Sequence, residues 1–301
     1  MATITASMIK ELRESTSAGM LDCKKALVAT DGDMEKAVVW LRERGIAKAV
    51  KKASAVAAEG LCSFVVKGNK AVLFELNSQT DFVAQNAKFL ALLDKVGEIL
   101  INGNATNDEE ALALSVDGKT LNDVILEQSG VIGEKLSLRR VTVITKTDGQ
   151  VFGAYKHMGG RIAVVAVLNG SDSVVAKDVA MHIAANAPKY TSSDEIPADA
   201  IAKEREVILN TALNENAKAA KPKPEAIIAE KIVPGRLEKS LKAICLVDQP
   251  FVKNPDQTVA EYVAGAKMSV STFVRLEVGE GIEVVESDFA AEVAAQAAQG
   301  K

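Results

Sequence analysis

The sequence has few of the side chains that carry out chemistry in enzymes. Its three cysteines, Cys23, Cys62 and Cys245, are odd in number and far apart, without the spacing of metal ligands, which indicates reduced thiols and a cytoplasmic protein. Only two histidines, His157 and His182, can exchange protons near neutral pH. A Gly-rich phosphate loop, a His-Glu-x-x-His pair and a Gly-x-Ser-x-Gly turn are all missing. We therefore predict that the protein is not an enzyme and has no catalytic residue, metal or cofactor.

An excess of positive charge and long apolar runs are lacking as well. Lys and Arg number 36 against 40 Asp and Glu, for a net charge of −4, whereas a nucleic-acid binder is expected to have a basic face. No apolar run approaches the roughly 18–20 residues that span a bilayer. The opening stretch MATITASMIKELRE has acidic residues and no apolar core, unlike a signal peptide. We expect neither nucleic acid nor a membrane as a direct partner.

Aromatic residues make up only 4% of the chain, whereas hydrophobic residues make up 48%. The cores must therefore be built mainly from Ala, Val, Leu and Ile. With 301 residues the chain exceeds one average domain. Its mixture of strand-like and helix-like segments predicts an α+β protein with several domains.

Residues 4–45 have the pattern of three short helices. Apolar residues spaced i, i+3, i+4 and i+7 share one face of a helix, and this spacing is found at Met34, Ala37, Val38 and Leu41. The stretches SAGM and DGD interrupt the pattern, and Asp33 is placed to cap the third helix. We expect a three-helix bundle, followed by a basic helical linker over 45–60 that leads away from it.

Two later segments share one pattern. GLCSFVVKGNKAVLFELN (60–77) has two strand-like runs around a glycine-containing turn, and a helix-like run over 80–101 follows. GQVFGAYKHMGGRIAVVAVLNG (149–170) repeats this arrangement, with a helix over 173–186. A lone hairpin is marginally stable, so each needs its helix as a cover, and we predict duplicated β-β-α core subdomains. Residues 117–140 have the pattern of two short helices joined by a glycine turn.

After residue 190 the pattern changes to charged helices. Residues 198–217 are one such run, and KPKP at 221–224 prevents helix at the turn before a second run, which predicts an inserted antiparallel helical hairpin, or coiled coil. The segment 256–285 then has the pattern of a helix and a strand, and an Ala-rich helix over 287–299 closes the chain. The expected domains are a three-helix domain with its linker (1–55), a first core subdomain (56–146) and a second core subdomain in two pieces (147–190 and 238–262). The helical hairpin (191–237) is inserted between those two pieces, and the C-terminal module (263–301) follows.

The junction after the first hairpin, LFELNSQTDFVAQN (73–86), places a carboxylate beside a large ring. Thr80 is a good N-cap, and Asp81 in the first turn suits the positive end of the helix dipole. Phe82 is in step with Phe89 along the expected helix, so spacing alone favours its burial. The alternative is that Phe82 stays outside the core as an anchor for a partner's pocket. Spacing does not decide between the two.

The two histidines have different surroundings. His182 lies among apolar residues of the expected helix over 173–186, which favours a structural role. His157 ends a strand at a glycine turn, where spacing also favours a structural role and an exposed contact is the alternative.

Several blocks carry a resemblance that spans the chain from its first helix to about residue 298. They are SMIKELRESTSAGMLDCKKALVATDGDMEKAVVWLRERG, TDFV, YKHMGGRIAVVAVL, QPFVK and FVRLEVGEGIE. In content and order they resemble the bacterial elongation factor Ts family. The family usually has Gly, Met and Cys-Glu where this chain has Ser17, Leu21 and Ser78-Gln79. The last departure removes one carboxylate beside Asp81 and Phe82, which are themselves intact.

The resemblance implies a guanine-nucleotide exchange factor for elongation factor Tu, the GTPase that carries aminoacyl-tRNA. It implies that Thr80, Asp81, Phe82 and Val83 push between helices of the GTPase domain and disrupt its Mg²⁺ and phosphate site. The N-terminal bundle is expected to grip a helix of the same domain through Leu12, Arg13, Met20 and Leu21. His157 is expected to meet a distal domain of the GTPase. The implied complex is 1:1, and a dimer of such complexes is compatible with it.

A second function class is a non-catalytic adaptor. A three-helix bundle of this size, with a small loop after its first helix, resembles ubiquitin-associated (UBA) modules, which bind partner surfaces passively. The release rate of fluorescent GDP from elongation factor Tu distinguishes an exchange factor from a UBA-like adaptor or scaffold.

Overall fold

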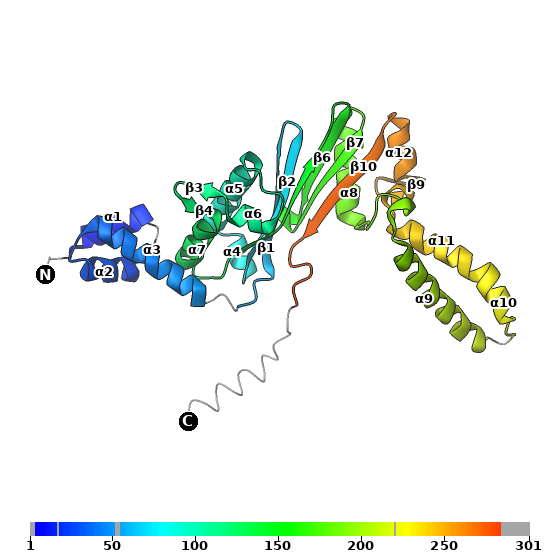
Figure 1. Ribbon diagram of the computed structural model, residues 1–301, viewed down its shortest axis with the longest axis horizontal. Coiled ribbons are helices and arrows are strands. Elements are labelled where there is room, and N and C mark those ends of the chain that lie inside the picture. The colour runs from blue at the N-terminus through cyan, green and yellow to red at the C-terminus, as the bar shows by residue number, and fades with distance from the viewer. Residues whose placement is uncertain (1–3, 17, 52–54, 220, 284–301) are drawn as a thin grey trace, which may run out of the picture. The chain divides into compact units, whose positions relative to one another are not determined.

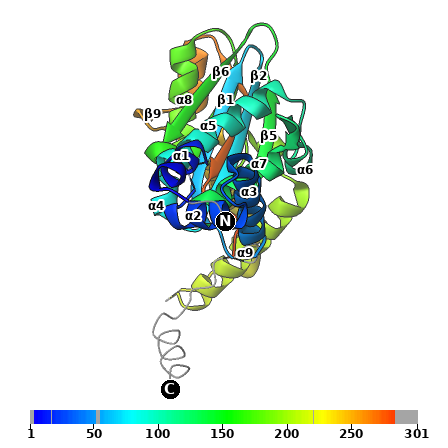
Figure 2. The ribbon, with the colours of Figure 1, turned by 90° about the vertical axis from the view of Figure 1, so that its left-hand side faces the viewer.

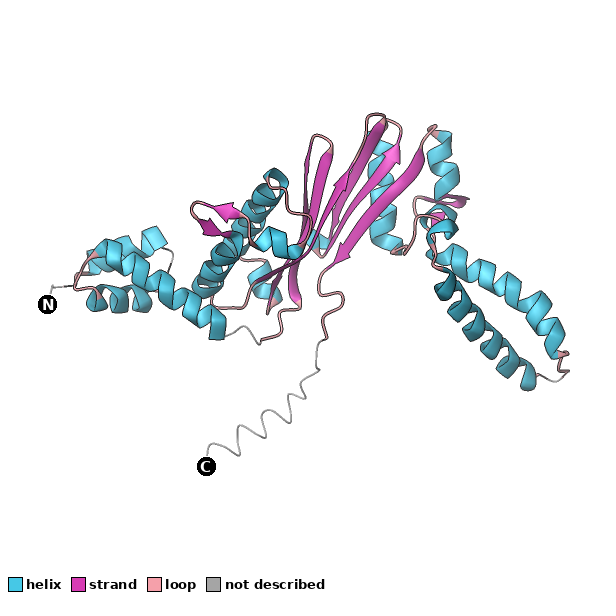
Figure 3. Cartoon of the chain, viewed as in Figure 1, coloured by secondary structure: helices cyan, strands magenta, loops and turns pink. Residues whose placement is uncertain are grey.

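The computed structural model describes residues 4–16, 18–51, 55–219 and 221–283, with the side chains of 46–51 left out. Helices and sheets are both present, which confirms the α+β class (Figure 3). The chain divides into two compact units. The first comprises Met1–Leu61, Phe74–Val141 and Glu277–Lys301, and the second comprises Cys62–Leu73 and Thr142–Leu276.

The first unit holds the helices of the N-terminal half of the chain (Figure 1). They are α1 (Ala6–Thr16), α2 (Met20–Ala29), α3 (Met34–Lys51), α4 (Asp81–Ala84), α5 (Ala87–Asn102), α6 (Asp108–Leu112) and α7 (Leu121–Ile132). A sheet in the order β1-β2-β5, some of whose residues are assigned to the second unit, consists of β1 (Glu59–Lys67), β2 (Lys70–Ser78) and β5 (Ser137–Thr145). A small antiparallel hairpin pairs β3 (Ser115–Val116) with β4 (Lys119–Thr120).

The three helices expected over 4–45 are present as α1, α2 and α3, which lie together in Figures 1 and 2. Their shared core is small and consists of Leu12, Cys23, Ala26, Leu27 and Ala37. Asp33 caps α3 as expected, because its Oδ1 accepts the N–H of Lys36 at 3.0 Å. The third helix is longer than expected and runs to Lys51.

The linker expected over 45–60 is helical in its first part, as the sequence predicts, because α3 runs to Lys51. Gly45 of α3 lies against Gly130 of α7, and a Cβ added at Gly130 would come within 2.5 Å of the carbonyl oxygen of Gly45. Arg42 and Lys119 both pair with Glu127 of α7 beside this contact. Two glycines therefore allow α3 and α7 to touch backbone to backbone, a contact that the sequence pattern did not indicate.

The two short helices expected over 117–140 are also wrong. The segment contains the β3–β4 turn, one helix and the start of β5. Thr120 and Asp123 form a capping box that starts α7, and Gly133 ends it in the left-handed conformation at φ 92°. The following run LSLRRVTVIT is rich in β-branched residues, and it forms a strand because those side chains suit a half-buried sheet.

The second unit is built on a sheet in the order β10-β7-β6. The strands of this sheet are β6 (Gln150–His157), β7 (Ile162–Asn169) and β10 (Ser269–Glu277), while β8 (Pro250–Phe251) and β9 (Asn254–Thr258) pair in a separate two-stranded sheet. Its helices are α8 (Ser173–Asn186), α9 (Ala198–Ala217), α10 (Glu225–Ile227), α11 (Val233–Ile244) and α12 (Val259–Gly265). The expected second hairpin is present, since β6 and β7 pair antiparallel from Gln150 with Asn169 to His157 with Ile162.

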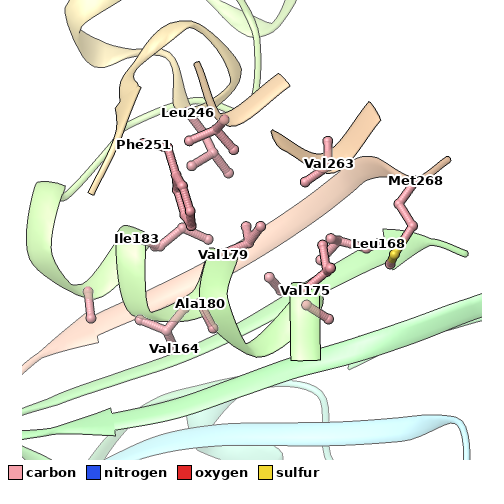
Figure 4. Close-up of a cluster of buried hydrophobic side chains, with 14 residues drawn as sticks. Val164, Leu168, Val175, Val179, Ala180, Ile183, Leu246, Phe251, Val263 and Met268 are labelled. Atoms are coloured by element: carbon pink, nitrogen blue, oxygen red, sulfur yellow. The ribbon is translucent and has the colours of Figure 1, made fainter. Parts of the chain in front are cut away.

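Helix α8 packs its apolar side on β7, as Figure 4 shows for Val164 and Leu168 of the strand and Val179 and Ile183 of the helix. Leu246, Phe251, Val263 and Met268 close the same core from the later part of the chain. Gly153 of β6 permits a close approach, because a Cβ there would meet the carbonyl oxygen of Ala176 of α8 at 1.9 Å. A helix begins at Ser173 and ends at Asn186, as the sequence predicts.

The helix expected over 198–217 is α9, and the chain returns after KPKP through α10, a π-helical turn and α11 (Figure 1). Ala212, Ile228 and Val233 are buried between the two arms. Glu215 pairs with Arg236 at 2.7 Å, and Glu204 accepts the hydroxyl of Ser240 at 2.6 Å. The two helices therefore run in opposite directions, in contact.

The chain beyond the hairpin supplies α12 and β10, which are the helix and strand expected within 256–285. The Ala-rich helix expected over 287–299, like Ser17, lies outside the described residues. The division into five domains stays a prediction. Within the described residues no helix is long and apolar enough to cross a membrane.

Candidate functional site

The corner, which we define as Gln79–Val83, joins β2 to α4. Thr80 caps α4, since its Oγ1 accepts the N–H of Val83 at 3.4 Å. Asp81 is exposed, and Phe82 is 82% exposed, whereas Val83 is half-buried. A phenylalanine contributes about 1.5–3 kcal/mol when it is buried. Phe82 leaves that free energy unused within its own fold.

The exposure of Phe82 contradicts the burial that its spacing favours. The sequence predicts one helix over 80–101, but the structure has two, α4 and α5, with Gln85 and Asn86 between them. Asn86 begins the second helix, because its Oδ1 accepts the N–H of Lys88 at 2.9 Å. Phe89 is fully buried on α5. The break takes Phe82 out of step with Phe89, so the two rings face different surroundings.

Glu134, in the loop after α7, makes three hydrogen bonds to the corner. Its Oε2 accepts the backbone N–H groups of Gln79 and Thr80, each at 3.1 Å. Its Oε1 accepts the hydroxyl of Thr80 at 2.7 Å. Sequence reasoning missed Glu134, because it lies more than fifty positions from the corner and no local pattern marks it.

The strand that leads into the corner is held by a buried carboxylate. Glu75 of β2 is fully buried, and its Oε2 accepts from Nε of Arg140 at 2.8 Å. Its Oε1 accepts the amide of Asn77 and the N–H of Gly279, each at 2.7 Å. Buried charges are tolerated when they are paired and hydrogen-bonded. This network fixes β2 three residues before its end and was also missed from the sequence.

The bundle residues named from the resemblance do not share one setting. Leu12 is fully buried in the bundle core, so its side chain supports the bundle and is not available to a partner. Arg13 is exposed, and Met20 and Leu21 at the start of α2 are 61% and 69% exposed. Leu21 also borders a shallow hollow on α2, whose other lining residues are Lys24, Lys25, Val28 and Ala29. The sequence did not single out these four.

The two histidines lie in different surroundings, and those of His182 agree with the structural role expected for it. His182 is fully buried, and burial lowers its pKa. Its ring contacts Oε1 of Gln249 at 2.9 Å and accepts the N–H of Val252 at 3.1 Å. His157 is half-buried at the end of β6, with Nδ1 3.3 Å from the hydroxyl of Tyr155.

The reactive side chains are shielded. All three cysteines are buried free thiols. Burial raises the pKa of Cys23 and of Cys245 and so disfavours the nucleophilic thiolate. Among the described residues no group of three His, Cys, Asp or Glu side chains is placed to hold a metal ion. The corner therefore offers an exposed ring and a carboxylate for binding.

Comparison with known proteins identifies the family of this chain. The family described as "Elongation factor TS" matches residues 79–280, which begin at the corner. Elongation factor Ts of Acholeplasma laidlawii is 54% identical over 295 residues, covering 98% of this chain and 99% of the relative. Elongation factor Ts of Levilactobacillus brevis is 52% identical over 291 residues, covering 96% and 97%. The chain therefore belongs to the elongation factor Ts family of translation elongation factors.

Proposed function

We propose that the protein is a guanine-nucleotide exchange factor for elongation factor Tu and that the corner is the part that dislodges GDP. The observation that carries the proposal is the 82% exposure of Phe82, next to an exposed Asp81, at the start of a helix. Exposed aromatic anchors of this kind carry much of the binding free energy at protein interfaces. Membership of the elongation factor Ts family supports the choice of partner.

The mechanism needs no covalent chemistry by this chain. GTPases hold the phosphates with backbone N–H groups, a lysine and a Mg²⁺ ion whose ligands must be in place together. A ring and a carboxylate that enter between helices beside this site displace those ligands by a small shift. Phe82 supplies the volume, and Asp81 supplies a charge that repels the phosphates and competes for their donors. Metal and phosphate contacts then weaken together, and GDP leaves.

Linkage sets the direction of the reaction. If the factor lowers the affinity of the GTPase for nucleotide, nucleotide lowers the affinity of the GTPase for the factor by the same ratio. Incoming nucleotide therefore dissolves the complex. In this proposal the preference for GTP over GDP comes from their cellular concentrations and not from this protein.

Further contacts are part of the same proposal. Arg13, Met20 and Leu21 grip the GTPase domain from the N-terminal bundle, supported by the exposure of all three, while Leu12 holds the bundle together. Val83 lines the base of the corner, and His157 meets a distal domain. The complex with elongation factor Tu is 1:1 and can form a dimer of such complexes, and nucleotide exchange takes place in the cytoplasm. The five-domain division, including the UBA-like bundle and the duplicated core subdomains, belongs to this proposal.

The test is the release of fluorescent GDP from purified elongation factor Tu. Truncating an aromatic hot spot costs about 2 kcal/mol or more, so Phe82→Ala should slow stimulated release by roughly 30-fold, and Asp81→Ala should slow it as well. Val174→Ala is the matched control. Val174 is also the second residue of a helix that follows a hairpin, and it is 67% exposed.

Three outcomes would count against the proposal. A wild-type protein that binds elongation factor Tu without accelerating release is an adaptor and not an exchange factor. A Phe82→Ala variant with full activity removes the corner from the mechanism. Equal losses in Phe82→Ala and Val174→Ala would indicate a general effect of surface truncation.

A further inference from the structure

We propose that Glu134 is the positioning residue of the corner and sets the direction in which Asp81 and Phe82 project. The inference rests on the proposed function, because Glu134 would affect nucleotide release only by way of Asp81 and Phe82. Glu134 itself need not touch the GTPase. Its carboxylate faces the backbone of its own chain at Gln79 and Thr80.

Besides the cap of α4, the corner's own segment holds it through the hydroxyl of Ser78, which donates to the carbonyl oxygen of Thr80 at 2.9 Å. Helix α4 is four residues long, and a single turn is unfavourable without outside support because nucleation fixes several residues for one hydrogen bond. The ring of Phe82 projects outward, and Asp81 makes no hydrogen bond or ion pair with other described residues. The direction of both side chains is therefore set by the backbone at 79–81, and that backbone is what Glu134 binds.

A carboxylate suits this task better than any other side chain. It presents two acceptor oxygens and no donor, which matches two N–H groups and one hydroxyl. The Thr80 hydroxyl donates its hydrogen to Oε1 of Glu134, so its lone pair points to the N–H of Val83. The capping bond of α4 is thus oriented by Glu134. Negative charge at this point also favours the N-terminal end of the helix.

Glu134 is itself fixed by α7. It follows Gly133, which ends the helix with φ 92°, and its own carbonyl oxygen accepts the hydroxyl of Ser129. A glycine is needed at this position because residues with a side chain rarely adopt a positive φ. A rigid element, α7, is therefore connected to the exposed corner by one side chain. Without it the corner would sample several directions, and only a fraction of molecules would carry Phe82 in the competent one.

That model separates two kinetic quantities. Met20 and Leu21 of the bundle do not depend on Glu134. The factor concentration that gives half-maximal GDP release should therefore be the same for the Glu134 variants as for the wild type. The saturating release rate should fall with the competent fraction. For Glu134→Ala we expect that rate to fall about tenfold, as it would if one molecule in ten were competent. For Glu134→Gln, which keeps one acceptor oxygen for the two N–H groups, the loss should be only about threefold, since neutral hydrogen bonds are weaker than charged ones.

The experiment measures GDP release from elongation factor Tu across a range of factor concentrations for wild type, Glu134→Ala and Glu134→Gln. Glu110→Ala is the matched control, because Oε2 of Glu110 likewise accepts a backbone N–H and a threonine hydroxyl, both from Thr106 at 2.8 Å. Each variant is repeated in a Phe82→Ala background. If Glu134 acts through the corner, its substitution should have little further effect once the ring is gone.

Amide hydrogen exchange on the factor alone gives a readout independent of the GTPase. Protection at Gln79 and Thr80 should be lost in Glu134→Ala and kept in Glu110→Ala. A folded Glu134→Ala with a wild-type saturating rate overturns the inference, as does an equal loss with and without Phe82. Should Glu134→Ala fail to fold, Glu134→Gln carries the test, and an unchanged rate overturns it. If the wild type does not accelerate release, the proposed function fails instead, and amide exchange still reports whether Glu134 orders the corner.

Discussion

Two helices that follow strand hairpins, α5 and α8, have the same place in the sequence pattern and differ in what they bury. The buried face of α5 consists of apolar side chains and one glycine. Helix α8 buries Asp178 and His182 as well. Asp178 accepts from Lys253 at 2.5 Å and from the hydroxyl of Tyr262 at 2.9 Å, so its polar interior connects α8 to later parts of the same unit.

The two helices also begin differently. Asp172 starts α8 in one step, since its Oδ1 accepts the N–H groups of Val174 and Val175 at 2.9 and 3.2 Å. Helix α5 is preceded by the separate turn α4, which carries Phe82. One helix therefore uses its polar residues for internal connections. Helix α5 buries an apolar face, and Asp81 and Phe82 stay exposed on the separate turn α4 that precedes it.

The largest test of this difference compares the two phenylalanines of the same segment. Phe89→Ala should lower the free energy of unfolding by about 3–5 kcal/mol, the cost of removing a buried ring, because Phe89 is fully buried. Phe82→Ala should change it by less than about 0.5 kcal/mol, as exposed positions do. Urea denaturation of both variants measures the contrast. Equal destabilisation would place Phe82 in the core and end its role as an anchor.

The sequence predicted local features of this region well. Thr80 and Asp33 were identified as caps from residue type alone, and the hairpins and α8 lie where the spacing puts them. The spacing of Phe82 misled because periodicity assumes an unbroken helix. The signal for the break was present, since Asn86 is a good N-cap, but a cap inside an apparently periodic run is easily taken for a surface residue.

Other features had no local signal. Glu134 and Thr80 are brought together only by the fold, as are Glu75 and Arg140, which lie 65 positions apart. An acidic residue in a strand-like run reads as a surface position until its partner is known. The contact of Gly45 with Gly130 was missed for the same reason. Caps and hairpins are encoded within a few residues, whereas the contacts that orient the corner depend on tertiary structure.

The second test uses the polar interior of α8. Nδ1 of His182 accepts the N–H of Val252, which fits a neutral ring that donates from Nε2 to Gln249. Burial lowers the pKa of His182 below 6.5. The unfolded chain then binds a proton that the fold excludes. Stability is therefore complete above about pH 6.5 and is lost as the pH falls below it, by at most about 1.4 kcal/mol per pH unit.

Urea denaturation at about pH 7.5 and about pH 5.5 measures this loss in the wild type and in two variants. His182→Gln should lose most of the pH dependence on this side. His157→Gln is the matched control, because these are the only two histidines, and it should keep the dependence. If His157→Gln abolished it instead, the assignment to α8 would be wrong.

The smallest effect comes from the two caps that start α5 and α8. Asn86→Ala and Asp172→Ala should each cost about 1 kcal/mol of stability, with the larger loss at Asp172, which accepts two N–H groups. Only Asn86→Ala should also slow GDP release from elongation factor Tu, because alanine lets α4 and α5 merge and turns Phe82 toward the face of Phe89. Asn86→Ser keeps the cap and should keep the rate. An Asn86→Ala variant with wild-type release would show that something other than this break keeps the ring outside.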